Sequence, residues 1–372
     1  MEKEDENGLL SVPLFLFSSL TIAGFLPWFR AHMGATTTTN AKAKKSPKTI
    51  NHVELVKTTC QEIVHNSKSV FIDASAIVKA AEELVDADLE SSVSKVNWNE
   101  GGWHYCEDAS TSGPKTCQYI FVLDALNFCF WPVQDLEYDY LASALKEAFI
   151  NDERIFEADF LKNIHEETLQ SWFPRFKLPL LNARVNRLRE MGAVLSEKYD
   201  GLACNVVLSA ENDAVALVQI IIENFPGFRD AYVHPKSGEY VHFYKRAQIL
   251  VGDIWAAYGR PEEGHQYYLS NMEELTTFAD YRVPQLLRNM GILKYNVDLE
   301  NLVDNCELIE CGTAVEMEIR ASTIIAVDML HKILMSRGLK ILVIELDWLL
   351  WQRGEQMKDC IKPHHRTLTI FY

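Results

Sequence analysis

Four segments of the sequence place charged or polar residues within otherwise apolar surroundings. Burying such groups costs free energy unless they pair with each other or take part in chemistry. Asp280, Lys245 and Asp347 are the charged residues of greatest interest in these segments. Aromatic residues accompany them, and aromatic walls with a few convergent polar groups suit a planar, polar ligand. The four segments cover residues 123–131, 241–253, 277–284 and 344–351.

Residue types alone leave a structural explanation open for each segment. Asp280 and Arg282, for example, could belong to structural ion pairs rather than contact a ligand. Lys245 or Asp253 would then be their partners. A single segment of this kind is more typical of such pairing than of a functional site. The four segments together favour a pocket for a flat, polar ligand, and they specify no reaction.

Several common motifs of nucleotide and hydrolase chemistry are absent. The sequence has no P-loop, no G-x-G-x-x-G turn, no G-x-S-x-G elbow, no H-E-x-x-H helix and no zinc deaminase signature. This excludes P-loop NTPases, the usual dinucleotide oxidoreductases, α/β-hydrolases and zinc hydrolases. The adjacent pair His364-His365 lacks partners at ligand spacing. We therefore expect a solvated or phosphate-facing role for it, and no metal site.

The charge of the chain disfavours polynucleotide binding. The 372 residues carry a formal net charge of −16, and the acidity lies in the body, because residues 1–52 contain more bases than acids. Such a body repels the backbone of DNA or RNA. A small ligand with one or two phosphates needs only a few local cations and remains compatible. The partner we expect is therefore a small molecule.

Cysteine usage indicates a reducing compartment. None of the eight cysteines has C-x-x-C spacing, and a chain of this length can build its core without a disulfide framework. We interpret them as buried thiols of a cytoplasmic protein.

The one long apolar run, residues 8–29, has about the 20 residues needed to cross a bilayer. Acidic residues precede it, which is not typical of a cleaved signal peptide. Two interpretations stay open: an anchor that is the only membrane contact, or a dispensable leader with translation beginning at Met33. Residues 36–46 have the composition of a linker in either case. We divide the chain into an N-terminal extension, 1–52, and a functional domain, 53–372.

The body shows mostly helical periodicity, with apolar residues at i, i+3 and i+4. Two apolar runs, 119–131 and 340–346, fit buried strands as well as helices. No alternation of strands and helices around a glycine-rich turn is present, and no fixed repeat. We predict a mostly α-helical fold with a few short strands. The predicted helices cover residues 182–199, 212–224, 242–258, 284–290 and 321–337.

Several strings of the body resemble the queuosine salvage family of N-glycosidases, from about residue 53 to residue 372. Members of that family hydrolyse queuosine 5′-monophosphate and release the base queuine, which can be reinserted into tRNA. The resemblance implies a mostly helical fold similar to DNA glycosylases, without a metal or organic cofactor. The matching strings are FVLDALNFCFW (121–131), HFYKRAQILVGDIW (242–255), FADYRVPQLL (278–287), VEMEIRAS (315–322), LDWLLW (346–351) and HHRTLTIFY (364–372).

The same resemblance implies roles for individual residues. Asp280 corresponds to the catalytic aspartate and Lys245 to a lysine near the reaction centre, while Phe278 lines the base site. Gln352 stands where the family commonly has a second aspartate. Its amide can hydrogen-bond to the base but cannot supply a negative charge to an amine on the ligand. The other residues expected to bind substrate are His104, Asn127, Arg282, Asp347 and Trp348.

The expected chemistry follows from the bond to be cleaved. Breaking the C1′–N9 bond builds positive charge on the ribose, and a carboxylate can stabilise that charge, deprotonate water or attack C1′. We expect Asp280 to act in one of these ways. Queuine is a 7-deazapurine without a ring nitrogen at position 7, so hydrogen bonds to the base edge must activate the leaving group. Lys245, with Arg246 or Arg282, would bind the 5′-phosphate or keep Asp280 ionised.

Two functions from other classes remain open on this sequence. A non-catalytic helical protein that binds a nucleobase or nucleotide would share the pocket without the reaction. A membrane-anchored interaction protein would use residues 8–29 as its anchor and the acidic body as a docking surface. Loss of base release in Asp280→Ala with ligand binding retained would identify the enzyme.

Overall fold

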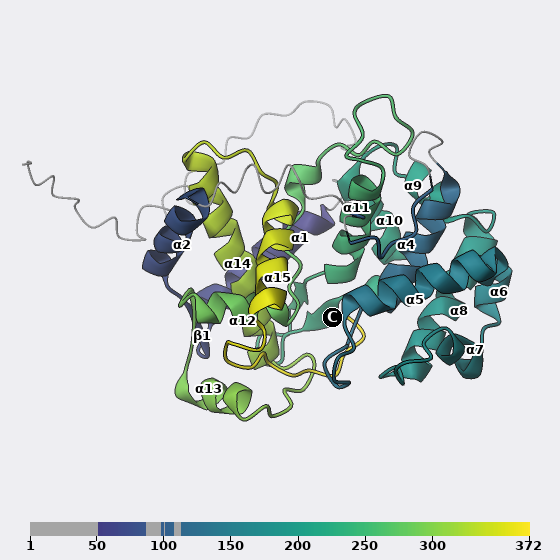
Figure 1. Cartoon of the computed structure of the whole chain (residues 1–372). Coiled ribbons are helices and arrows are strands. Elements are labelled where there is room, and N and C mark those ends of the chain that lie inside the picture. The colour runs from purple at the N-terminus through teal and green to yellow at the C-terminus, as the bar shows by residue number, and fades with distance from the viewer. Residues whose placement is uncertain (1–50, 87–97, 100, 108–112) are drawn as a thin grey trace, which may run out of the picture. The chain divides into compact units, whose positions relative to one another are not determined.

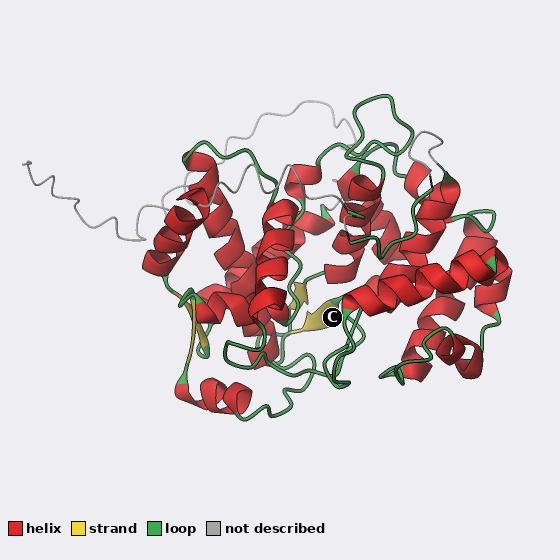
Figure 2. Ribbon diagram, viewed as in Figure 1, coloured by secondary structure: helices red, strands yellow, loops and turns green. Residues whose placement is uncertain are grey.

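The computed structural model describes residues 51–86, 98–99, 101–107 and 113–372. Within them the chain is mostly α-helical, with two short antiparallel two-stranded sheets, which confirms the predicted fold class (Figure 2). The likeness to DNA glycosylases stays a prediction. The apolar run 8–29 lies outside the described residues. No helix in the described ranges combines the length and the hydropathy that crossing a membrane requires.

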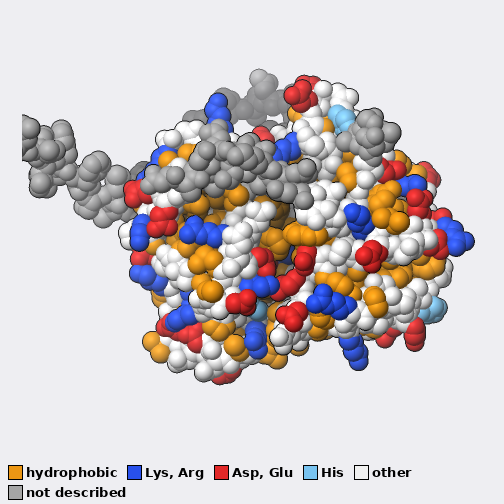
Figure 3. All heavy atoms as spheres, viewed as in Figure 1, with side chains coloured by type: hydrophobic (Ala, Val, Ile, Leu, Met, Phe, Trp, Pro, Cys, Tyr) orange, Lys and Arg blue, Asp and Glu red, His pale blue; other side chains and the backbone are white. Residues whose placement is uncertain are grey.

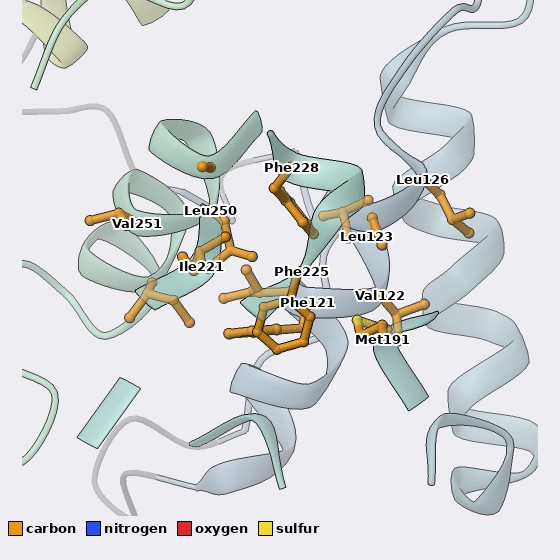
Figure 4. Packing of buried hydrophobic residues seen from close by; sticks show 14 of the residues in the cluster. Phe121, Val122, Leu123, Leu126, Met191, Ile221, Phe225, Phe228, Leu250 and Val251 are labelled. Atoms are coloured by element: carbon orange, nitrogen blue, oxygen red, sulfur yellow. The ribbon is translucent and has the colours of Figure 1, made fainter. Parts of the chain in front are cut away.

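The larger hydrophobic core surrounds α4 (Pro114–Leu126), which is buried on nearly every side. A helix that is apolar all round has no amphipathic stripe, which is why its periodicity could not distinguish it from a strand. It packs against α11 (Lys245–Ala257) and α8 (Leu181–Lys198). Figure 4 shows side chains of α4 meeting those of α8, α10 and α11. The other elements here are α1 (His52–Asn66), α5 (Tyr138–Asn151), η4 (Glu153–Phe156), α6 (Ala158–Lys162), α7 (Glu166–Ser171), α9 (Ala203–Leu208), α10 (Ala214–Asn224), η5 (Pro226–Phe228) and η6 (Met272–Glu274).

A second, smaller hydrophobic core is formed mainly by helices from the C-terminal part of the chain. Figure 1 shows α2, α12, α14 and α15 on one side of the described body and α4, α5 and α8 on the other. α1 packs against α14 and so connects the two groups. The elements of this core are β1 (Val70–Ile72), α2 (Ala74–Asp86), α12 (Arg282–Asn289), β4 (Leu293–Tyr295), α13 (Val297–Asp304), α14 (Ala314–Ser336) and α15 (Val343–Met357).

The two sheets differ in what they connect. β1 pairs with β4, with Val70 opposite Tyr295, so the chain near its described beginning joins the segment after α12. β2 (Ala231–Val233) pairs with β3 (Tyr240–His242) directly before α11. The predicted helix 242–258 therefore begins later than expected, at Lys245, because its first residue belongs to a strand and Tyr244 adopts a left-handed conformation with φ of 50°.

A buried ion pair ties these elements together. The guanidinium of Arg320 on α14 donates to both carboxyl oxygens of Asp230, at 2.9 and 2.6 Å, and both side chains are fully buried. Arg320 Nε also donates to the carbonyl of Ala279 at 3.1 Å, and Asp230 Oδ2 accepts from the backbone N–H of Lys245 at 3.2 Å. The pair thus holds the segment before Asp280 and the first residue of α11 in fixed positions.

Two expectations about cysteine and histidine environments need correction. All eight cysteines are free, but Cys106 and Cys360 are exposed, so the interpretation of uniformly buried thiols is wrong. The solvated role expected for the histidine pair is wrong for His365, which is 2% exposed. Its Nε2 lies 3.3 Å from the hydroxyl of Tyr372, a neighbour that sequence spacing could not identify.

Candidate active site

A cavity of approximately 340 Å³ is lined by α5, α11 and α15 and by the loops that precede α4 and α12. Its volume is in the range of small-molecule sites, and its lining combines aromatic rings with a few charged groups, as such sites usually do. On the face drawn in Figure 3, acidic and basic side chains gather near the middle, over the region of α15 and α5. The aromatic lining includes Trp98, Trp103, Tyr138, Phe278, Trp348 and Trp351.

The structure brings together most of the residues predicted to act on a substrate. Arg282 is the exception, because it does not line the cavity. The predicted residues that do line it are His104, Asn127, Lys245, Phe278, Asp280, Asp347, Trp348 and Gln352.

Asp280 lies at the start of α12, where backbone N–H groups hold its carboxylate. Oδ1 accepts from the N–H groups of Arg282 and Val283, at 2.9 and 3.0 Å. These donors belong to the first turn of the helix, where the helix dipole also favours negative charge. Burial raises the pKa of Asp280, while Lys245 and the two N–H groups act against that rise. Lys245 and the two N–H groups therefore limit the rise in the pKa of this buried carboxyl group.

Lys245 is the first residue of α11 and projects into the same cavity. Burial lowers the pKa of its ammonium group, and the charge of Asp280 acts most strongly in the opposite direction. Within the described ranges no carboxylate lies within ion-pair distance of its nitrogen. The lysine consequently influences Asp280 through space and remains available to a ligand.

Asp347 connects α15 to the loop before α12. Its Oδ1 accepts a short hydrogen bond from the hydroxyl of Thr277 and a second from the backbone N–H of Phe278 at 2.9 Å. Burial and the neighbouring charge of Asp280 raise the pKa of Asp347 to about 7. Near neutral pH this group is therefore able to donate as well as accept a hydrogen bond.

His104 is held in a defined tautomer. Its Nδ1 lies 2.7 Å from the carbonyl oxygen of Trp98, so Nδ1 must donate, and Nε2 then accepts from the Tyr138 hydroxyl at 2.9 Å. The Trp98 ring stacks on the imidazole at 3.9 Å. Burial lowers the pKa of His104 to about 4, so the ring is neutral at physiological pH. Both ring nitrogens are engaged by protein groups, which leaves its carbon edge for ligand contact.

The two arginines considered for phosphate binding are occupied elsewhere. Arg282 Nε donates to Glu355 at 2.6 Å, and its NH1 donates to Gln285 at 2.6 Å. Arg246 is 1% exposed. It donates to the carbonyl oxygens of Asp124 and others of the core. Arg246 therefore faces the core and not a phosphate, which corrects that part of the prediction. Arg282 joins α12 to α15, and its charge lowers the pKa of Asp280, in line with the alternative role expected for it.

Sequence reasoning missed several groups of this site. Tyr138 is separated by more than thirty residues from His104, and nothing in its surroundings indicated a site. Trp98 is likewise an isolated aromatic residue in the sequence, whereas Trp103 directly precedes His104, and that adjacency was a signal available for it. Asp253 was considered only as an ion-pair partner, yet it lines the cavity and is 5% exposed. Its position eight residues after Lys245, on one helical face, was the signal available.

Comparison with known proteins identifies relatives of this chain. Residues 106–372 match the family model described as queuosine salvage protein. The queuosine 5′-phosphate N-glycosylase/hydrolase of Dictyostelium discoideum is 40% identical over 328 residues, covering 87% of this chain and 100% of that protein. The protein of the same name from Sphaerobacter thermophilus is 37% identical, covering 85% and 97%. The one from Mus musculus is 29% identical, covering 83% and 96%.

Proposed function

Because the chain belongs to the queuosine salvage protein family, we propose that it hydrolyses queuosine 5′-monophosphate at the N-glycosidic bond and releases queuine for salvage into tRNA. Relatives at 37–40% identity that are covered almost completely by this chain have the name of that activity. We assign the reaction to residues 53–372 and to the cytoplasm.

The observation that supports catalysis most directly is the environment of Asp280. A carboxylate held by two backbone N–H groups inside an aromatic cavity can stabilise the positive charge that develops on the ribose. Because such a group is already oriented, little reorganisation is needed when positive charge develops on the ribose. Lys245 helps to keep this carboxylate ionised. In this proposal Asp280 faces C1′ and orients or deprotonates the attacking water.

The base would lie between aromatic side chains of the cavity. A Cβ at Gly252 would lie 3.5 Å from the Phe278 ring and 3.6 Å from the Trp348 ring, so both rings lie against this turn of α11. Flat heterocycles stack on such rings. Asp347 and Gln352 then supply hydrogen bonds at the edge of the base, and Asp347 can do so as a donor or an acceptor.

The decisive experiment is incubation of the wild-type protein with queuosine 5′-monophosphate, with free queuine quantified by mass spectrometry. Queuosine and its 3′-monophosphate serve as comparison substrates. We expect queuine release by the wild type and by Asp298→Asn, a control at an exposed position on α13. Asp280→Asn should bind queuine but release almost none from the nucleotide. Absence of release by the wild type would contradict the proposal.

A further inference from the structure

A second pair of acids lies beside the cavity, apart from Asp280 and Asp347. Asp124 belongs to α4 and Asp253 to α11, two helices that pack against each other. Asp124 is fully buried, and Asp253 is 5% exposed and lines the cavity. Oδ2 of each lacks a hydrogen-bond partner within the described part of the chain. Buried carboxyl oxygens usually take part in hydrogen bonds, and the Oδ2 atom of Asp253 is free to make one with a ligand in the cavity.

The surroundings of this pair favour the protonated form of a carboxyl group. Burial raises the pKa of both carboxyl groups, and the charge of Asp124 raises that of Asp253 further. Asn127 donates to Asp124 Oδ1 at 3.3 Å. Burial and the charge of Asp124 therefore both favour the protonated form of Asp253.

The titratable and polar groups around Asp253 come from several elements. Lys245 of α11 lowers its pKa, as does the Trp98 side chain of the loop before α4. Tyr119 of α4 and Tyr138 of α5 also interact electrostatically with it. Two acids of α15 also line the cavity: Asp347, which is associated with Asp280, and Glu355, which pairs with Arg282. Near Asp253, the single positive charge of Lys245 is therefore too little to favour the charged forms of both Asp124 and Asp253.

The position of Asp253 along α11 separates it from the reaction centre at Asp280. Lys245, Ile249 and Asp253 occupy i, i+4 and i+8 and line the cavity from one face of the helix. Eight residues correspond to about 12 Å of helix. Lys245 lies near Asp280, whereas Asp253 lies beside Gly252, the residue that faces the rings of Phe278 and Trp348. With the base stacked on these rings, as in the proposed function, Asp253 lies at the level of the base along α11, and Asp280 lies near the sugar.

We propose that Asp253 is the proton donor to the departing base and that Asp124 is a positioning residue whose negative charge keeps the proton on Asp253. This inference rests on the proposed function. The C1′–N9 bond breaks, and its electron pair moves into the base. The proton of the Asp253 carboxyl group passes to an acceptor of the pyrimidine ring, N3 or O6, because a 7-deazapurine has no nitrogen at position 7.

The remaining steps balance the reaction. Water adds to C1′ and gives a proton to Asp280, so the products are queuine and ribose 5-phosphate. Proton exchange with solvent then returns Asp280 to its carboxylate form and Asp253 to its acid form. Water is the only co-reactant that this balance needs, and no oxidation or reduction takes place. These steps assign opposite roles to two carboxyl groups at different positions along one cavity, a known arrangement in glycoside hydrolysis.

The test compares two leaving groups in the full chain. Queuosine 5′-monophosphate needs a proton on its base, whereas p-nitrophenyl β-D-ribofuranoside 5-phosphate releases p-nitrophenolate without one. For Asp253→Asn we expect kcat on the nucleotide to fall by roughly 10² to 10⁴, the usual contribution of a general acid. On the aryl compound kcat should fall by less than about tenfold, since no proton is needed. Asp280→Asn should lose activity on both substrates, and Asp298→Asn on neither.

A second measurement tests the role of Asp124. Asp124→Asn removes the charge that raises the pKa of Asp253. The alkaline limb of the kcat profile on the nucleotide should therefore move to lower pH, with activity retained on the acidic side. Queuine binding and the thermal unfolding midpoint of each variant show whether it is folded.

Several results would overturn the inference. One is an equal loss of kcat on both substrates in folded Asp253→Asn, and another is nucleotide activity unchanged in that variant. An alkaline limb that does not shift in Asp124→Asn would also overturn the inference. This measurement uses the nucleotide alone, so it applies even if the wild type does not accept the aryl compound. Failure of the wild type to release queuine would instead contradict the proposed function, so the two failures are distinguishable.

Discussion

Asp280→Asn is the substitution that separates charge from structure most cleanly at this site. The asparagine side chain has an oxygen in the place of Oδ1, which can accept the same two hydrogen bonds from Arg282 and Val283. The first turn of α12 should therefore form as before. What the variant loses is the negative charge that faces the developing positive charge of the ribose.

The size of the effect can be worked out from this charge. A full charge at about 4 Å from C1′, with an effective dielectric constant of about 20, contributes about 4 kcal/mol. That value corresponds to a decrease of about 10³ in kcat. KM should change little, because the ribose of the ground state is neutral and gains little from the carboxylate. The loss should therefore fall on kcat rather than on substrate binding.

The assay is steady-state release of queuine from queuosine 5′-monophosphate over a range of concentrations, with the exposed-site variant Asp298→Asn as the control. Equilibrium binding of queuine to each variant shows that the cavity is intact. A folded Asp280→Asn whose kcat lies within about tenfold of the wild type would refute the electrostatic role, since one removed charge should cost far more. A change confined to KM would refute it equally.

Three further predictions concern the surroundings of the site. Lys245→Met removes a cation that lowers the pKa of Asp280, so that pKa rises and the acidic limb of kcat/KM moves to higher pH, measured as a pH–rate profile. Arg320→Met leaves Asp230 buried without its partner and should lower the free energy of unfolding by about 3–5 kcal/mol in urea titrations. A shortened chain beginning at Met33 should retain the wild-type kcat, because every residue that lines the cavity lies after it; substantial loss would contradict the division of the chain at residue 52.

The acids of the cavity could be predicted from the sequence more readily than the ion-pair partners of its charged residues. Asp280 and Asp347 stood out because a carboxyl group within an apolar segment is costly, and both line the cavity. Arg282 looked equally exceptional, yet its guanidinium pairs with Glu355, more than seventy residues later. Whether a charged side chain points into a cavity or toward a partner depends on contacts between distant elements. No local pattern contains that information.

The fold was predictable where one helical face is apolar and the other is polar. α8, which extends from Leu181 to Lys198, coincides within one residue with its predicted range. α4 could not be assigned because it is buried almost all round. The beginning of α11 was misplaced because the pairing of β3 with β2 and the left-handed Tyr244 end the strand before the helix starts. Long-range pairing, not propensity, decided that boundary.

The environments of Asp280 and Asp253 explain how one cavity can hold the same residue type in two protonation states. Asp280 receives two backbone N–H groups at a helix start, donors that stabilise only the charged form. Asp253 has an oxygen that accepts no hydrogen bond, and the charge of Asp124 acts on it. The rise in its pKa that burial causes is therefore opposed more weakly than at Asp280. Cleavage of an N-glycosidic bond needs negative charge near the sugar and a proton near the base. Because two backbone N–H groups hold the carboxylate of Asp280, exchanging the roles of the two acids would oppose the field that the fold provides. The pH profile of Asp124→Asn therefore tests this assignment more directly than the loss of activity in any single-site variant.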